Sequence, residues 1–408
     1  MNRRVVVTGM GGITALGDSW DAIEPAIRNG RNAIRRMPEW DRFEALHTRL
    51  GGPVDGFRAP AHYERKHLRS MGRVSLLAVR ATEMSLADAG LLQDSSVSDG
   101  RMGVAYGSSS GSVEPVRVFG RMLATGSMDG VTSTSYIQMM PHTTAVNVGL
   151  YFQIKGRLIP TSSACTSGSQ ALGYAYESIR YGRQLLMVAG GAEELSAAGA
   201  AVFDTLFATS TRNDMPAVTP RPFDRERDGL VVGEGAATLV LEDYDHAVAR
   251  GARIHAEIIG FATNSDGAHV TEPVASTMGE VMRLALQDAG LPPAAIRYVS
   301  AHGTATEAGD IAESHATSSI LGEKVAISSM KSYLGHTLGA CGAIEAWWGI
   351  EMLKRGWFAP TINLDALDPS CADADYIVGE GRQMDLECFM SNNFAFGGVN
   401  TSLVFKKH

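Results

Sequence analysis

Cysteine is scarce in this chain, with four in 408 residues, at positions 165, 341, 371 and 388. No two of them have the Cys-X-X-Cys spacing of a zinc or redox site, and four are too few for the disulfide framework of a secreted scaffold. We therefore expect free thiols, a reducing cytoplasmic environment and no metal site.

Long apolar runs and excess positive charge are also absent. The run Val5–Val7 after Arg3 and Arg4 stops at Gly9, and no other stretch approaches the ~20 apolar residues of a membrane span. The chain carries 36 Lys and Arg against 44 Asp and Glu, for a net charge of −8. That charge disfavours nucleic acid and an anionic membrane as partners.

The chain is instead rich in glycine, with 45 residues, and alternates short apolar strands with segments of helical length. This alternation predicts a layered α/β fold with mixed, buried sheets. The order of elements restarts near residue 250, so we expect two similar halves, 1–250 and 251–408. The predicted strands include 5–9, 103–107, 185–190, 236–241, 251–266, 297–301, 325–328 and 401–405, and the predicted helices include 20–28, 69–89, 166–181, 278–289 and 340–354.

One candidate for chemistry is Cys165, which lies in the small-residue run Thr161–Ser169 between a strand-like segment and a predicted helix. A helix N-terminus presents free N–H groups and partial positive charge, which favour a thiolate and a developing oxyanion. Taken alone, a cysteine here is more often an inert core residue. Whether Cys165 is a nucleophile or a core residue therefore depends on the chemically active residues that lie near it in the fold.

Two histidines and a glycine-aromatic loop supply those neighbours. His302 and His336 each follow a predicted strand, the position at which α/β proteins place their sites. The loop 391–400 contains the pair Gly397–Gly398, which permits mobility beside a pocket. Each feature has a plain structural alternative. Together they indicate a thiol nucleophile served by two imidazoles.

These motifs resemble the β-ketoacyl-[acyl-carrier-protein] synthases, most closely the synthase II type. The resemblance includes the elbow around Cys165, the His-Gly-Thr motif at 302–304, the segment Lys331–His336 and the loop 394–400, and it spans nearly the whole chain. It implies the thiolase fold, a five-layered α/β/α/β/α arrangement of two similar halves. It also implies acyl-carrier protein as partner, a homodimer, and no cofactor beyond the phosphopantetheine that carries the substrates.

The resemblance also assigns the chemistry. Cys165 would accept an acyl group, malonyl-acyl-carrier protein would lose CO2, and the enolate would attack the acyl-enzyme. His302 and His336 would stabilise the enolate oxygen through N–H bonds. The backbone N–H groups of Cys165 and Phe396 would form an oxyanion hole. Lys331, with Glu345, would order the His336 side of the site.

The remaining assignments concern the walls of the site. By the same resemblance, Asp310 would support the His-Gly-Thr loop, and Thr304 and Thr306 would bind the pantetheine or malonyl group. Phe394 would lie near the departing carboxylate, and Phe396 would gate the acyl pocket.

Carrier proteins are acidic, so a chain of net charge −8 needs a local basic surface to bind one. Arg65, Arg69 and Arg73 follow the i, i+4, i+8 spacing of one helical face, with Lys66 beside them. We predict that this face docks the carrier protein, with Arg212 as a second contact. An ordinary solvated helix face is the alternative.

Four positions differ from the family pattern. Glu307 stands in place of a usual proline, Ala395 in place of the first glycine of the gating loop, and Val399 in place of a common threonine. Ser110 lies where a larger apolar residue narrows the acyl pocket, so it would admit a longer or unsaturated chain. These differences suggest a specialised pathway, such as polyene or other polyketide-like lipid assembly, rather than housekeeping fatty-acid elongation, and the sequence is compatible with both.

Two other functions share this fold. A thiolase would use a second cysteine where this chain has its second histidine, and we interpret Cys341 as a packing residue. A catalytically silent chain-length partner subunit would lack the nucleophile, although a heterodimer with an active partner is compatible with the sequence.

Overall fold

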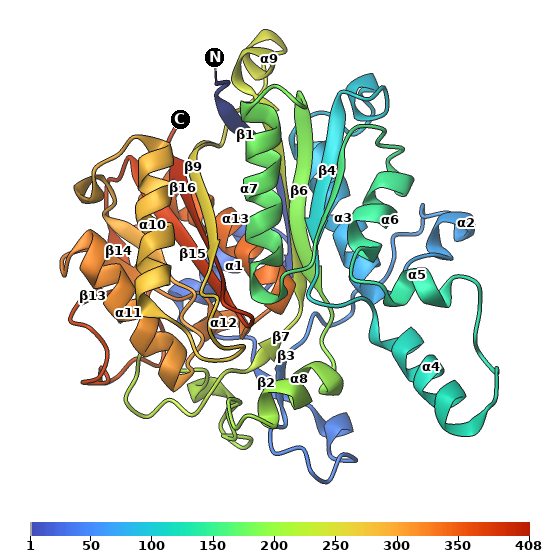
Figure 1. The fold of residues 1–408 in the computed structure, drawn as a ribbon, viewed down its shortest axis with the longest axis horizontal. Helices are drawn as coiled ribbons and strands as arrows, with labels where there is room; N and C mark the ends of the chain where they lie inside the picture. Colours follow the sequence, from blue (N-terminus) through green and yellow to red (C-terminus); the bar gives the residue numbers. More distant parts are fainter. Residues whose placement is uncertain (1) are drawn as a thin grey trace.

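The structure is a computed structural model that describes residues 2–408 (Figure 1). Its strands are β1 (Val5–Thr14), β2 (Arg35–Arg36), β3 (Leu50–Gly52), β4 (Met102–Gly107), β5 (Leu158–Thr161), β6 (Leu186–Glu193), β7 (Val232–Gly233), β8 (Gly235–Asp243), β9 (Ala256–Ser265), β10 (Tyr298–Ser300), β11 (Ala326–Ser328), β12 (Trp357–Phe358), β13 (Asp375–Tyr376), β14 (Arg382–Gln383), β15 (Cys388–Ala395) and β16 (Val399–Lys406).

The α-helices lie between these strands. They are α1 (Trp20–Arg28), α2 (Arg65–Leu68), α3 (Arg73–Asp88), α4 (Val113–Thr125), α5 (Ser135–Met139), α6 (Thr143–Tyr151), α7 (Ser167–Arg180), α8 (Ala197–Asp204), α9 (Tyr244–Ala249), α10 (Ala275–Ala289), α11 (Glu307–Leu321), α12 (Lys331–Leu334) and α13 (Cys341–Arg355). Within residues 2–408, no helix is both long enough and apolar enough to cross a lipid bilayer.

The strand order shows the two similar halves directly. The first half has the order β5-β4-β6-β8-β1 and the second has β11-β10-β15-β16-β9. In both, the second strand is parallel to its two neighbours and the fourth is antiparallel to its two neighbours. A short antiparallel contact between β1 and β9 joins the two sets of strands. The predicted division near residue 250 falls between α9 and β9.

The helices complete five layers, which follow one another from left to right in Figure 1. Helices α10 and α11 form one outer layer, and α3 and α6 form the other. Helices α7 and α13 lie between the two sets of strands and contact each other. The α/β/α/β/α arrangement expected from the resemblance is confirmed. The two sandwiched helices matter most for function, because the candidate nucleophile lies at the start of one of them.

Close packing of α7 against α13 depends on small residues. A Cβ on Gly168 would lie 3.0 Å from the carbonyl oxygen of Gly339 and 3.0 Å from the amide nitrogen of Ala343. Contacts this short would push the two helices apart. Helix α13 is buried on every side from Cys341 to Leu353, as its central layer requires.

Two predicted elements differ from the structure. The predicted helix 69–89 begins only at Arg73, because Gly72 is extended and packs so tightly on Ser112 that a Cβ would lie 2.1 Å from the serine Oγ. Strand β15 was not predicted, and the loop expected at 391–400 is a hairpin of β15 and β16 with its turn at 396–398. The other strands and helices predicted above are present, with ends shifted by a few residues.

Candidate active site

Cys165 lies at the elbow between β5 and α7, as the sequence predicts. The residue before it, Ala164, has a φ of 51°, a left-handed conformation that is strained for a side chain with a Cβ. Ser167 Oγ donates to the carbonyl of Ala164 at 2.7 Å and accepts from the N–H of Ser163 at 3.0 Å, which holds the turn in this shape. The elbow thus places Cys165, 5% exposed, at the amino end of the central helix.

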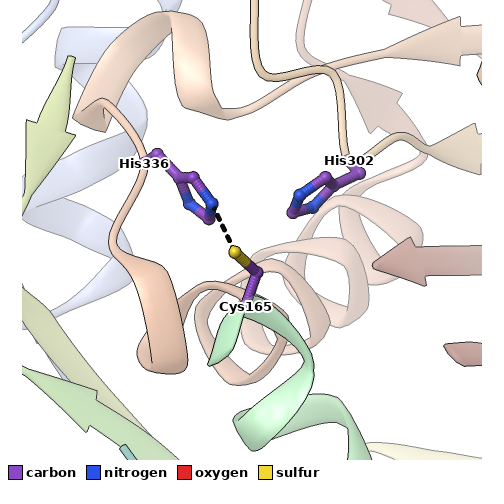
Figure 2. Close-up of side chains that lie close together, drawn as sticks. All are labelled: Cys165, His302 and His336. Atoms are coloured by element: carbon purple, nitrogen blue, oxygen red, sulfur yellow. Dashed lines mark hydrogen bonds between the residues drawn. The ribbon is translucent and has the colours of Figure 1, made fainter. Parts of the chain in front are cut away.

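His336 is in direct contact with the candidate nucleophile. Its Nε2 lies 3.0 Å from Cys165 Sγ (Figure 2). On the other side of the ring, Nδ1 accepts from the N–H of Leu338 at 3.2 Å. Because Nδ1 accepts, the proton of the neutral ring belongs on Nε2, and that N–H points at the sulfur.

His302 presents the same tautomer from the opposite side. Lys331 Nζ lies 3.1 Å from His302 Nδ1 and donates to it, so the proton of this ring also belongs on Nε2. The centroids of the His302 and His336 rings are 5.1 Å apart, and the ring planes are nearly perpendicular. Figure 2 shows the two rings on either side of the cysteine sulfur.

A buried charged network holds Lys331 in place. Its Nζ donates to Glu345 Oε1 at 2.5 Å, and Asn393 Nδ2 donates to Glu345 Oε2 at 2.7 Å. The prediction that Lys331 and Glu345 order the His336 side was wrong in one respect. The lysine contacts His302, whereas His336 is oriented by the backbone N–H of Leu338.

The surroundings keep both rings neutral and the thiol protonated. Burial, helped by the charge on Lys331, lowers the pKa of His302 and of His336 well below the usual value. Burial raises the pKa of the Cys165 thiol to about 12, although Lys331 and the N–H groups of Phe396 and Cys165 act in the opposite direction. Those two N–H groups thus favour negative charge at the elbow, as an oxyanion hole requires.

Two carboxylates on α11 shape the His-Gly-Thr loop. Asp310 accepts from the N–H of Ala305 at 3.2 Å, which agrees with its predicted supporting role. Glu313, which the sequence analysis missed, accepts from the N–H groups of His302 and Gly303, each at 2.7 Å, and burial raises its pKa to about 8. Glu313 follows Asp310 by three residues, so the two carboxylates lie on the same face of one helix, and this spacing could have indicated Glu313.

Glu193 is another carboxylate that the sequence analysis missed, and it connects the two halves of the chain near the site. One oxygen of Glu193, at the end of β6, accepts from the N–H of Ser109 at 2.7 Å and from that of Gly339 at 3.0 Å. Gly339 follows His336 by three residues, so the carboxylate fixes the segment that carries this histidine. Burial raises the pKa of Glu193 to about 7.

A cavity of about 470 Å³ leads from the surface to Cys165 and both histidines. Thr304 and Thr306 line it, and their hydroxyl groups share a hydrogen bond of 2.8 Å. Phe394 also lines it, with its ring centroid 6.2 Å from that of His302. Phe396 lies 5.3 Å from Phe203, centroid to centroid, on the side of His336. All four residues thus line the cavity, and their roles toward a substrate stay predictions.

Comparison with known families gives this site its context. The model of the β-ketoacyl synthase N-terminal domain matches residues 2–247, and that of the β-ketoacyl synthase C-terminal domain matches residues 255–365. The chain belongs to the β-ketoacyl synthase family. It is 38% identical to 3-oxoacyl-[acyl-carrier-protein] synthase 2 of Vibrio harveyi, over 99% of each chain.

Solved structures of similar proteins agree with this assignment. A β-ketoacyl synthase from Burkholderia phymatum STM815 superposes with a TM-score of 0.99 at 68% identity, over the whole of both chains. The complex AntDE:AntF, a type II PKS acyl-carrier protein with its ketosynthase, contains a chain that superposes with a TM-score of 0.88 at 31% identity, again over both whole chains. The chain is thus an acyltransferase of the ketosynthase class, with the thiolase fold.

The donor set of this synthase is unsuited to a metal ion. Cys165, His302 and His336 offer ligand atoms within 4.8 Å of one another. A metal-binding histidine normally donates its second N–H to an acceptor, which leaves the other nitrogen free for the metal. Here both Nδ1 atoms accept hydrogen bonds instead. The Nε2 atoms therefore carry protons and point N–H groups, not lone pairs, at the centre.

The gating loop of the synthase is tied to the segment that follows β9. The N–H of Gly397 donates to the carbonyl of Val270 at 2.8 Å, and the N–H of Asp266 donates to the carbonyl of Gly398 at 2.8 Å. Gly397 and Gly398 have φ values of 88° and 69°, which favour glycine. Asn400 Nδ2 donates to Asp266 Oδ1 at 2.7 Å. Hydrogen bonds thus hold the gating loop, at 397–400, against the segment 266–270.

Three of the four departures from the family pattern lie at or next to the cavity opening, namely Glu307, Ala395 and Val399. Ala395 and Val399 pair with each other at the end of the β15–β16 hairpin, so the hairpin closes without the missing glycine. Glu307 is exposed at the first turn of α11, where a carboxylate interacts favourably with the helix dipole. Ser110 is exposed and is not among the residues that line the cavity, so its predicted role in the acyl pocket stays a prediction.

The predicted docking helix is not formed. Arg65 and Lys66 belong to the short helix α2, Arg69 follows it, and Arg73 begins a separate helix, so the three arginines share no continuous face. Arg73 is committed to Glu234, with Nε 2.5 Å from Oε1. Arg212 is held by the carbonyl of Glu226 and by Asp228. Exposed Arg65, Lys66 and Arg69 remain available for docking, but none of them lines the cavity.

Proposed function

We propose that this chain catalyses decarboxylative Claisen condensation between an acyl group held on Cys165 and malonyl-acyl-carrier protein. The products are 3-oxoacyl-acyl-carrier protein and CO2. The observation that carries the proposal is the pair of imidazole N–H groups, from His302 and His336, that converge with Cys165 Sγ in one buried cavity. Fatty-acid and polyketide-like chains are both substrates of this type, and neither needs a cofactor beyond phosphopantetheine.

Acylation comes first. Cys165 Sγ attacks the thioester carbonyl of acyl-acyl-carrier protein, the C–S bond to the pantetheine breaks, and the proton of the Cys165 thiol leaves with the pantetheine sulfur. The positive charge of Lys331, the N–H of His336 and the amino end of α7 favour negative charge on the sulfur. The N–H groups of Cys165 and Phe396 stabilise the tetrahedral oxyanion.

Condensation follows in the same cavity. The malonyl thioester oxygen accepts from Nε2–H of His302 and of His336, its C–CO2 bond breaks, and the electron pair of that bond forms an enolate. The enolate carbon attacks the acyl carbonyl, the bond to Cys165 breaks, and the thiolate regains a proton. Neutral rings suit this step because they donate N–H bonds without giving up a proton.

A thiolase-type reaction is disfavoured by the position of the second cysteine. Cys341 Sγ lies 3.3 Å from the backbone carbonyl of Cys165 and near Asn393, behind the nucleophile and outside the residues that line the cavity. It therefore cannot act as the acid or base of a thiolase without rearrangement. The presence of Cys165 with both histidines also argues against a silent chain-length subunit.

The test uses purified protein with acyl-acyl-carrier protein, followed by malonyl-acyl-carrier protein. Mass spectrometry should find the acyl group on Cys165, and the second addition should release CO2 and form a 3-oxoacyl thioester. Cys165→Ala should abolish the adduct, whereas Cys388→Ala, which removes a buried thiol at the start of β15, should retain it. An intact Cys165 after exposure to a panel of acyl chain lengths would refute the proposal.

We also propose that the synthase forms a homodimer through the free edge of β5. This strand ends the sheet, and an unpaired edge readily pairs with another chain. Leu158 on β5 is 45% exposed and Leu150 on the adjacent α6 is 63% exposed, so apolar side chains accompany the edge. Leu158→Asp should halve the mass in sedimentation equilibrium, and Val248→Asp, on exposed α9, should leave it unchanged. An unaltered mass for Leu158→Asp would exclude this interface.

A further inference from the structure

One face beside the active-site cavity is unusually poor in charge. The stretch Leu195–Thr211, which includes α8 and the turn after it, contains a single charged residue in a chain that is 20% charged. That residue, Asp204, is 4% exposed. The surface of this segment therefore carries no charged side chain. Its large exposed side chains are Val202, Leu206 and Phe207, which are 55%, 46% and 83% exposed.

Asp204 is used internally to hold the turn after α8. Its carboxylate accepts from the N–H groups of His47 and Thr48, at 2.8 and 3.0 Å, and from the hydroxyl of Thr209 at 2.8 Å. The N–H of Phe207 donates to the Asp204 carbonyl at 3.0 Å. The turn is thus fixed to a separate segment of the chain and presents its apolar side chains in a defined place.

Phe207 combines two unfavourable features. Its φ of 52° lies in the left-handed region, which is costly for an aromatic residue. Its ring is largely in water, and the ring centroid lies 5.9 Å from that of His47. Asn or Gly would suit this backbone better and would expose no apolar area. A residue that is both strained and exposed is expected at a functional surface.

The exposed turn is continuous with the catalytic centre. Leu206 and Phe207 line the outer part of the cavity that ends at Cys165. Phe203, from the last turn of α8, lines its inner part and lies 6.5 Å from His336, centroid to centroid. One helix and its turn thus contribute both to the wall near the nucleophile and to the rim at the surface.

We infer that Leu206 and Phe207 form an apolar docking surface, the rim patch, on which the acyl-carrier protein rests while its phosphopantetheine arm enters the cavity. This inference rests on the proposed function, because the arm must pass this rim to reach Cys165. The patch contacts the apolar surface of the carrier protein next to the attachment point of the arm.

Charge does not supply the attraction at this rim. Glu272 and Glu307 are exposed carboxylates that also line the cavity, and they repel an acidic protein. Among the described residues of the lining, the one arginine or lysine is Arg227, whose side chain is 3% exposed and bound to Asp368 at 2.7 Å. Attraction at the rim must therefore come from apolar contact. In Figure 1, α2, which carries Arg65 and Lys66, lies well apart from α8, so these basic residues are not part of the rim patch.

The test compares substrates with and without the carrier protein. Phe207→Asn removes the apolar ring and keeps a residue that tolerates the left-handed backbone, so its Tm should equal or exceed that of the unaltered chain. The KM for acyl-acyl-carrier protein should rise about tenfold, the effect of removing one aromatic side chain from an interface. The KM for acyl-pantetheine should rise much less, because this substrate has no carrier protein to contact the rim patch. Val248→Asn, at an exposed site on α9 at the opposite end of the molecule in Figure 1, is the matched control.

Three results would overturn the inference. An unchanged KM for acyl-acyl-carrier protein would show that the rim patch does not contact the carrier. An equal rise in KM for acyl-pantetheine would assign Phe207 to the arm or the acyl chain instead. A fall in molecular mass for Phe207→Asn would show that a second copy of this chain covers the patch. If the unaltered protein forms no Cys165 adduct with either substrate, the proposed function itself fails.

Discussion

Lys331 Nζ lies 3.1 Å from His302 Nδ1, on the side of the ring that faces away from the nucleophile. The lysine is 29 residues from this histidine in sequence but only five from His336, which it does not contact through a hydrogen bond. Its ammonium group decides which nitrogen of His302 carries the proton. Lys331 is thus a positioning residue for the donor that stabilises the enolate.

Replacing Lys331 should therefore separate the two half-reactions. In Lys331→Met, His302 Nδ1 is left with the longer contact to Asn393 Nδ2, at 3.4 Å, so its tautomer is fixed less firmly. CO2 release from malonyl-acyl-carrier protein should fall about 100-fold, as for loss of one oxyanion donor. Acylation of Cys165 should fall less, because His336 and the backbone N–H groups remain. Stopped-flow CO2 release and mass spectrometry of the adduct measure the two steps. Lys354→Met, which removes a lysine paired with Glu351 on α13, is the control. Equal losses in both steps would contradict the assignment.

The pH dependence of decarboxylation should show no histidine titration near neutrality. Both rings have pKa values well below 6.5, so protonation of the rings should not change the rate between pH 6 and 8. Lys331→Met removes a charge that lowers the pKa of His302, so the pKa should rise and the rate of this variant should fall on the acid side first. A fall in the decarboxylation rate of the unaltered enzyme with an apparent pKa near 6.5 would show that the rings are more hydrated than the structure indicates.

Glu193 should make stability depend on pH. Its pKa is raised from 4.5 to about 7, so the folded state holds a proton that the unfolded state releases. The free energy of unfolding should therefore fall as pH rises from 4.5 to 7, by about 1.4 kcal/mol per pH unit from this group, and level off above 7.

Glu193→Gln isolates that contribution. One Glu193 oxygen accepts both N–H bonds, so the amide oxygen of glutamine can replace it. The variant should lose the share of the slope between pH 4.5 and 7 that comes from Glu193, and it should be the more stable form above pH 7. Urea denaturation at several pH values gives the difference. Parallel curves for the two proteins would rule out titration of Glu193 in this range.

The sequence predicts the parts of the site that depend on local pattern. Cys165 follows β5 and His302 follows β10, whereas His336 comes after β11 and the short helix α12. Small or glycine-rich residues mark the turns, so the type and place of these residues can be recognised from short segments. Their convergence came from the family resemblance, because no spacing shows that two halves of a duplicated fold meet at one cavity.

What the sequence missed depends on tertiary contacts. Strand β15 contains Asn392 and Asn393, which are fully buried, and polar residues in a buried strand break the apolar pattern used to find it. The buried side chain of Asn393 is stabilised by its hydrogen bond to Glu345. The i, i+4, i+8 argument for Arg73 assumed one helix, whereas the contact of Gly72 with Ser112 divides it into two.

The size of the acyl chain should be controlled by Phe203. Its ring lines the cavity, lies 5.3 Å from the Phe396 ring, centroid to centroid, and is 7% exposed. Phe203→Ala enlarges the cavity next to His336, so long acyl chains gain room and apolar contact that short chains do not use. The ratio of kcat/KM for long over short acyl-acyl-carrier proteins should rise about tenfold, the effect of one or two methylene groups in an apolar pocket.

Stability should also respond, since a buried ring is removed beside an existing cavity. The Tm of Phe203→Ala should fall, and measurements at 20 °C keep that loss from obscuring the change in specificity. Phe43→Ala removes a ring that is 40% exposed and does not line the cavity, so it should leave the ratio unchanged. If Phe203→Ala lowers kcat/KM by the same factor for every chain length, Phe203 positions the gate through Phe396 and does not limit chain length.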